Sequence, residues 1–72
     1  MFYIIEIQKN AEGQYAHLVY TAESQNQAES IYYDKLHFAA VSTLPLHSVV
    51  LITESGDHHM SKAYRHAPEG NP

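Results

Sequence analysis

The strands that this sequence predicts are apolar on both faces, although the chain offers one helix to cover them. Residues 2–5 read Phe-Tyr-Ile-Ile and residues 49–52 read Val-Val-Leu-Ile, without a polar residue in either run. An antiparallel sheet with one packed face and one solvated face should instead alternate apolar and polar side chains. One helix can cover one face of a small sheet. The other face therefore needs a partner, and the simplest partner is a second copy of the chain.

The length of the chain makes such a partner more important. Seventy-two residues form one domain near the lower limit for folding alone. A chain this short buries only about 60% of its unfolded surface, so its core supplies roughly 3–5 kcal/mol. Cysteine is absent, which removes disulfides and cysteine-ligated zinc and fits a reducing compartment. No apolar run reaches the ~18 residues of a membrane span, so we expect a cytoplasmic protein with no membrane contact.

The charge balance argues against nucleic acid as a partner. Four Lys and Arg residues stand against eight Asp and Glu residues, giving a net charge of −4. The cations are scattered along the chain, whereas a protein that binds phosphates needs a basic patch. Six histidines permit a response to pH.

The pattern predicts the element order ββαββ in a single α+β domain, residues 1–66. We expect strands at 1–8, 15–21, 47–54 and 59–66, a helix at 25–42, and a disordered tail at 67–72. Gly13 and Gly56 mark the hairpin turns. Ser24 and Gln27 form a capping box at the start of the helix, and Pro45 ends it. An antiparallel sheet then has the strand order 2-1-3-4, with the helix on one face.

The first hairpin decides which side chains share a face. If residues 10–13 form a four-residue loop, Glu6 lies opposite His17 as a cross-strand ion pair. The core under the helix would then contain these sheet residues: Tyr3, Ile5, Ile7, Leu18, Tyr20, Val50, Ile52 and Met60. The open face, which we expect to mediate self-association, would contain these: Phe2, Ile4, Tyr15, Val19, Val49 and Leu51. A patch of this size usually indicates an interface.

The helix also carries apolar residues on more than one side. Its best stripe has helical spacing and should face the core: Ala28, Tyr32, Leu36 and Ala39. Ile31 and Phe38 fall outside this stripe. They are candidates for a second contact surface, while Lys35 between the two zones can extend its ammonium to water.

The histidines raise the alternative of a metal or small-ligand site. His17, His47 and His59 could share the open sheet face with Glu6, a set that zinc could use. The second and fourth strands are opposite edges of the expected sheet, roughly 14 Å apart. Only a dimer seam could bring such ligands together, and simple acid–base catalysis by a histidine would be conceivable there.

Catalytic and nucleic-acid signatures are weak. No serine has a nucleophile-elbow context, and nothing selects one carboxylate pair over another, so we expect a non-catalytic protein without a cofactor. Tyr15 and Phe2 on a sheet face could stack unpaired bases. That arrangement works with surrounding positive charge, and Glu6 stands there instead. Single-stranded nucleic-acid binding is therefore the third hypothesis, and its affinity would fall steeply with salt.

Residues 27–42 (QAESIYYDKLHFAAVS), followed by residues 47–51 (HSVVL), resemble small bacterial proteins of no assigned activity, some of them carried by prophages. The resemblance covers most of the chain, contains no functional motif and implies no site residues. It favours a bacterial or phage-infected cytoplasm. Taken together, the residues predict a homodimer or higher oligomer that associates through its open sheet face and engages another protein.

Overall fold

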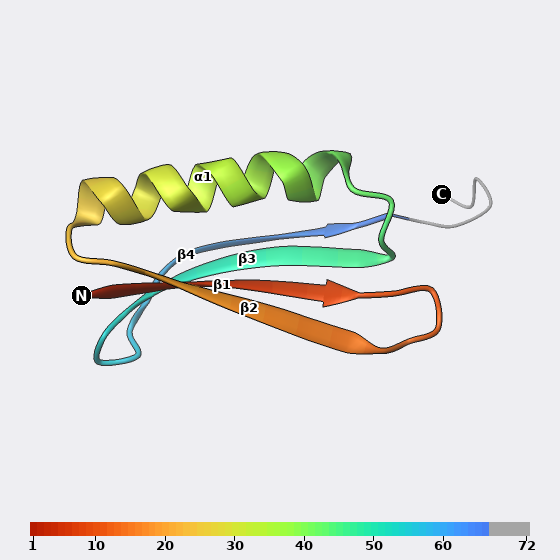
Figure 1. Ribbon diagram of the computed structural model, residues 1–72, viewed down its shortest axis with the longest axis horizontal. Coiled ribbons are helices and arrows are strands. Elements are labelled where there is room, and N and C mark those ends of the chain that lie inside the picture. The colour runs from red at the N-terminus through yellow and green to blue at the C-terminus, as the bar shows by residue number, and fades with distance from the viewer. Residues whose placement is uncertain (67–72) are drawn as a thin grey trace.

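A four-stranded antiparallel sheet with one helix on one face makes up the computed structural model, which describes residues 1–66 (Figure 1). The elements follow in this order: β1 (Phe2–Lys9), β2 (Tyr15–Ala22), α1 (Gln25–Val41), β3 (Leu46–Thr53) and β4 (His58–Arg65). The strand order is β2-β1-β3-β4. The predicted ββαββ topology is confirmed, with strand boundaries shifted by about one residue. The predicted tail at 67–72 lies outside the described residues.

Each hairpin turns on a glycine with positive φ. Gly13 has a φ of 86° and Gly56 a φ of 89°, a conformation that costs other residues energy. In the first hairpin, the side-chain Oδ1 of Asn10 accepts hydrogen bonds from the backbone N–H groups of Glu12 and Gln14, each at 2.9 Å. The backbone N–H of Asn10 in turn donates to the carbonyl of Gln14 at 2.9 Å. This bond continues the alternation of the β1–β2 pairing one residue beyond the strand ends, at Asn10 and Gln14.

Helix α1 begins and ends where the sequence predicts. Ser24 is the N-cap, and its side chain accepts a hydrogen bond from the backbone N–H of Gln27 at 3.2 Å. The Gln27 side chain reaches back to the N–H of Glu23, one residue before the position that a capping box requires. At the other end Ser42 is the C-cap, and Pro45 excludes further helix. The helix then lies along the sheet and packs mainly on β3 and β1.

The core lies between α1 and one face of the sheet. Ile4, Val49 and Leu51 are 0% exposed, and the helix contributes Ala28, Tyr32 and Ala39 to the same cluster. The predicted helix stripe is thus confirmed, with Leu36 partly buried beside it. Phe2, Tyr20 and Met60 also pack against this cluster.

The prediction of which sheet residues form the core was partly wrong. Tyr20 and Met60 do pack against it, but Leu18 is 49% exposed at the margin. The β1 residues Tyr3, Ile5 and Ile7 and the β3 residues Val50 and Ile52 alternate with the core residues and belong to the other face. The cause is the first hairpin: Ile5 pairs with Val19 rather than with Leu18, because Asn10 pairs with Gln14. A slip of one residue exchanges the two faces of a strand.

Candidate interaction face

The face of the sheet away from α1 is covered by none of the residues 1–66, and we call it the open face. Its centre is a row in which Ile5 lies between Val19 on β2 and Val50 on β3. The neighbouring row places Tyr3 beside Ile52 of β3. Ile7 extends the apolar surface along β1. Strand neighbours shield the central residues in part, whereas Tyr15 and Val19 on the edge strand are 66% and 53% exposed.

The lysine and arginine of the open face stand at one end of it, whereas the uncharged Ser48 lies within the face beside Ile7. Lys9 and Arg65 lie at one end, in the row that also contains Tyr15 and Leu46. The Lys9 ammonium lies 5.6 Å from the centre of the Tyr15 ring, within range of a cation–π interaction. Among the described strands, no carboxylate points to this face. The open face is therefore an apolar centre with cations at one end.

The residues predicted for self-association divide between the two faces. Tyr15 and Val19 lie on the open face, as expected. Placing Ile4, Val49 and Leu51 there was wrong, because all three are fully buried under α1, and Phe2 packs against the same core. Their neighbours in sequence take their place: Tyr3, Ile5, Ile7, Val50 and Ile52. No hydrophobic pattern could have shown this, since both faces are apolar; the Asn10 turn was the available signal.

A buried polar pair, which the sequence interpretation missed, lies under the helix. His47 Nε2 and Glu6 Oε2 are 2.5 Å apart, and the two residues are 4% and 5% exposed. The Tyr20 hydroxyl donates to Glu6 Oε1 at 3.2 Å, so three strands meet at this carboxylate. The predicted partner of Glu6 was His17, but His17 pairs with Ile7 and lies on the open face. The pair ties β1 to β3 inside the core.

The three histidines proposed as metal ligands are not brought together. His17 is on the open face and His47 is in the core. His59 stands at the rim of the helix side, where its Nε2 is 3.6 Å from Glu29 Oε2. Within residues 1–66, no group of three histidine or acidic side chains could hold a metal ion, and no pocket is found.

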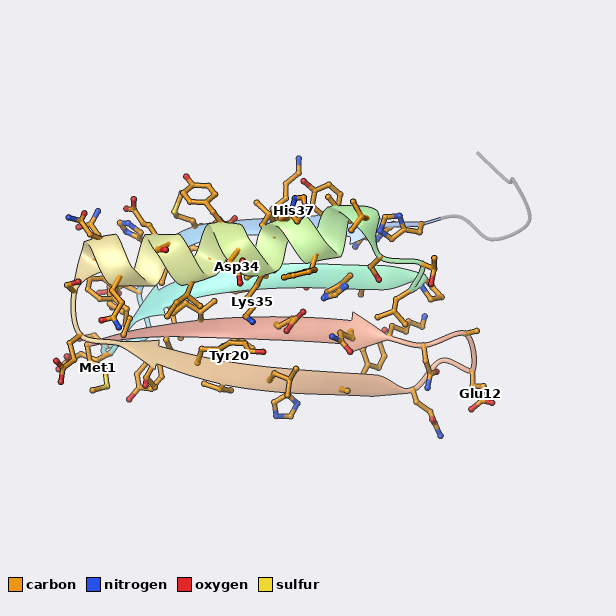
Figure 2. The ribbon with its side chains drawn as sticks, turned by 45° about the horizontal axis from the view of Figure 1, so that its top comes forward. Met1, Glu12, Tyr20, Asp34, Lys35 and His37 are labelled. Atoms are coloured by element: carbon orange, nitrogen blue, oxygen red, sulfur yellow. The ribbon has the colours of Figure 1, made fainter. Side chains whose placement is uncertain are left out.

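The two helix residues proposed as a second contact surface lie on the flank of α1 that faces β2. Figure 2 shows Lys35 reaching down from the helix toward Tyr20, and the ammonium is 4.6 Å from the centre of the Tyr20 ring. Ile31 and Phe38 are four residues before and three residues after Lys35, so they occupy the same flank. Ile31 is partly buried against the core, whereas Phe38 is 54% exposed.

Two carboxylates at the margin of the structure have altered ionisation. A hydrogen bond from Gln25, with a smaller contribution from His59, lowers the pKa of Glu29. The N-terminal amine of Met1 lies 2.6 Å from Glu54 Oε1 and lowers the pKa of that carboxyl. Glu54 is exposed and Glu29 is half-buried, and both stabilise element ends rather than building a site.

The fold and this surface define an α+β domain with one apolar sheet face uncovered. No protein-family model, curated protein or solved structure matches the chain. Of the helices in residues 1–66, none is long and apolar enough to cross a membrane.

Proposed function

We propose that this protein is a non-catalytic interaction module that forms homo-oligomers through the open face of its sheet. The observation that carries the proposal is the apolar centre of that face, built by Ile5, Val19 and Val50 with Tyr3 and Ile52 beside them. Monomeric proteins seldom leave so continuous an apolar patch in water. The resulting oligomer would engage another protein, and the absence of cysteine fits the cytoplasm.

The area of the face agrees with a pair of copies. Four strands of eight residues, at about 4.8 Å between strands and about 3.3 Å per residue, cover about 500 Å². Two such faces bury about 1,000 Å², which is about the minimum expected of a biological interface. Two sheets packed face to face would form a sandwich with a helix on each outer side.

The rim cations favour one orientation of the copies. Lys9 and Arg65 occupy one end of the open face. If β1 of one copy runs opposite to β1 of the other, the cations of each copy lie over the end of the partner's face that carries Tyr3. They then do not lie over each other. If β1 of one copy ran parallel to β1 of the other, the cations of the two copies would face each other across the interface, which costs free energy.

The test is a pair of double variants that differ in face alone. Val50→Asp with Ile52→Asp places two charges on the open face and should lower the native mass at least twofold, with the circular dichroism of the fold retained. Val49→Asp with Leu51→Asp places them in the core and should unfold the chain.

Ser30→Asp on the exposed side of α1 is the control and should leave both mass and fold unchanged. Light scattering at micromolar concentration and at tenfold dilution measures the mass. A wild-type chain that is monomeric at both concentrations, or an unchanged oligomer of the Val50 and Ile52 variant, would contradict the proposal.

A further inference from the structure

The two edges of the sheet differ in how well they are protected from pairing with another strand. Edge β4 carries Lys62 and Arg65, and its register with β3 shifts between Leu51 and Ile52. Charged residues and bulges are the means by which proteins block edge pairing. Edge β2 has eight residues with no Asp, Glu, Lys, Arg or Pro, and it pairs with β1 without interruption.

Strand β2 is also exposed on both of its faces. Tyr15 and Val19 are exposed on the open side, and Leu18 is 49% exposed on the helix side. Helix α1 reaches β2 at Tyr20 and Ala22 but leaves Leu18 uncovered. In Figure 1, β2 diverges from the helix toward the turn that joins it to β1. A long, uncharged and apolar edge of this kind is a site at which further strands add.

The hydrogen bonds of the first hairpin show which backbone groups of β2 are free. Since Asn10 and Gln14 form a hydrogen-bonded pair, every second residue from Gln14 onward points its backbone groups toward β1. The alternate residues point their N–H and C=O groups away from the sheet: Tyr15, His17, Val19 and Thr21. A strand added to this edge would pair with these groups.

We propose that β2 pairs antiparallel with β2 of a second copy, on a two-fold axis at Leu18. This register is the one that pairs all four outward residues, because His17 then meets Val19 of the second copy and Tyr15 meets Thr21. A shift by two residues in either direction leaves an end of the strand unpaired. The strand contains no Asp, Glu, Lys or Arg, so none of these charged side chains face each other across the axis. Tyrosine opposite threonine is a favourable cross-strand neighbour pair.

The helix side of the strand fits the same arrangement. A two-fold axis perpendicular to the sheet puts both helices on the same side of an eight-stranded sheet. Leu18 of each copy then meets at the axis, between the helix flanks that carry Ile31 and Phe38. Because α1 and β2 run in opposite directions in Figure 1, the C-terminal half of α1 lies on the side of the sheet where β2 begins.

This edge contact uses a surface separate from the core of the open face, so the two can be tested independently. Edge pairing would double the open face into one continuous surface. Face-to-face packing of two such doubled sheets would give a tetramer with two kinds of two-fold axis.

Disulfide trapping tests the register directly, since the natural chain contains no cysteine. Leu18→Cys places two thiols at the axis in a non-hydrogen-bonded pair, with Cα atoms about 4.5 Å apart, within disulfide range. Ala16→Cys is the matched control, because Ala16 is exposed on the helix side of β2 and not on the open face. Its two thiols would be offset along the strands by four residues, with Cα atoms about 14 Å apart and out of range. Cross-linking of the Leu18 variant under mild oxidation should be more than about tenfold faster than cross-linking of the control variant.

Two further variants separate this inference from the proposed function. The combination of Leu18→Cys with Val50→Asp and Ile52→Asp should still cross-link, because the open face is not needed at the edge. Leu18→Lys alone should halve the native mass while leaving the face contact intact. A Leu18→Cys chain that stays monomeric, or cross-links no faster than Ala16→Cys, would overturn the edge pairing without affecting the open face.

Discussion

The two faces of the sheet contrast in an unexpected direction. The face buried under α1 contains the ionisable pair Glu6 and His47, whereas the uncovered face presents Ile5, Val50 and Ile52. Apolar content alone would assign the core to the second face. The core nevertheless forms on the covered face. The helix contributes Ala28, Tyr32 and Ala39 to it, and the hairpin register places Ile4 and Leu51 on the same face. The contrast leaves an apolar sheet face uncovered, and our proposal of a contact on that face rests on it.

Removing the histidine of the buried pair should give the largest effect on stability. His47→Ala leaves the Glu6 carboxylate buried without its partner, which costs about 3–5 kcal/mol. That equals the roughly 3–5 kcal/mol available to a core of this size, so we expect an unfolded chain. His17→Ala, on the open face, is the matched control and should stay folded. Urea unfolding followed by circular dichroism measures both; equal stability of the two variants would show that the pair does not hold the core.

Two neighbouring isoleucines provide the next comparison. Ile4→Ala removes a side chain that is 0% exposed, and we expect a loss of about 2–5 kcal/mol that does not depend on protein concentration. Ile5→Ala removes the same atoms from the open face, and its main effect should be on association. Unfolding curves at two concentrations distinguish the two losses. A larger, concentration-independent loss for Ile5 than for Ile4 would reverse the assignment of the faces.

The sequence predicted the topology because its signals are local. Gly13, Gly56, Ser24 and Pro45 each mark a boundary through their own backbone chemistry, and the strand order follows from antiparallel pairing. The same reasoning identified the helix stripe from its spacing. These features do not depend on which side of the sheet the helix occupies.

The assignment of faces failed because it is a non-local property with two nearly equal solutions. The side chains on both faces of β1 and β3 are apolar. A register shifted by one residue therefore fits the hydrophobic pattern as well as the observed register does. The hydrogen bonds of the Asn10 side chain decide the register. In the sequence, the only sign of these hydrogen bonds is a single asparagine in a turn. Glu6 added a misleading signal, since a carboxylate is rarely placed in a core.

The N-cap of α1 tests the element that makes the faces different. Ser24→Ala removes the acceptor for the N–H of Gln27 and should lower the free energy of unfolding by about 1 kcal/mol. Ser24→Asp retains a capping oxygen and serves as the control. Because the cap stabilises the helix and not the open face, the native mass should stay unchanged. A change of oligomeric state in Ser24→Ala would mean that the helix also takes part in association.

The smallest expected effect concerns the rim of the covered face, where Glu29 joins α1 to β4. Its pKa is lowered from the ordinary 4.5, first by the hydrogen bond from Gln25 and less by His59. A carboxyl whose pKa falls on folding contributes stability above its unfolded value, and this contribution is lost as the pH drops through the folded value. The acid limb of the stability curve below about pH 4.5 should therefore be less steep in Glu29→Gln.

The two causes can be separated by titrating the Glu29 carboxyl by NMR. Gln25→Ala should raise its pKa more than His59→Ala, because the amide of Gln25 lies 2.9 Å from Glu29 Oε2 and the imidazole 3.6 Å. The reverse order would make this rim an ion pair between the helix and the edge strand. Edge β4 would then be held to the helix by charge, which would sharpen its contrast with β2, where Leu18 has no helix residue over it.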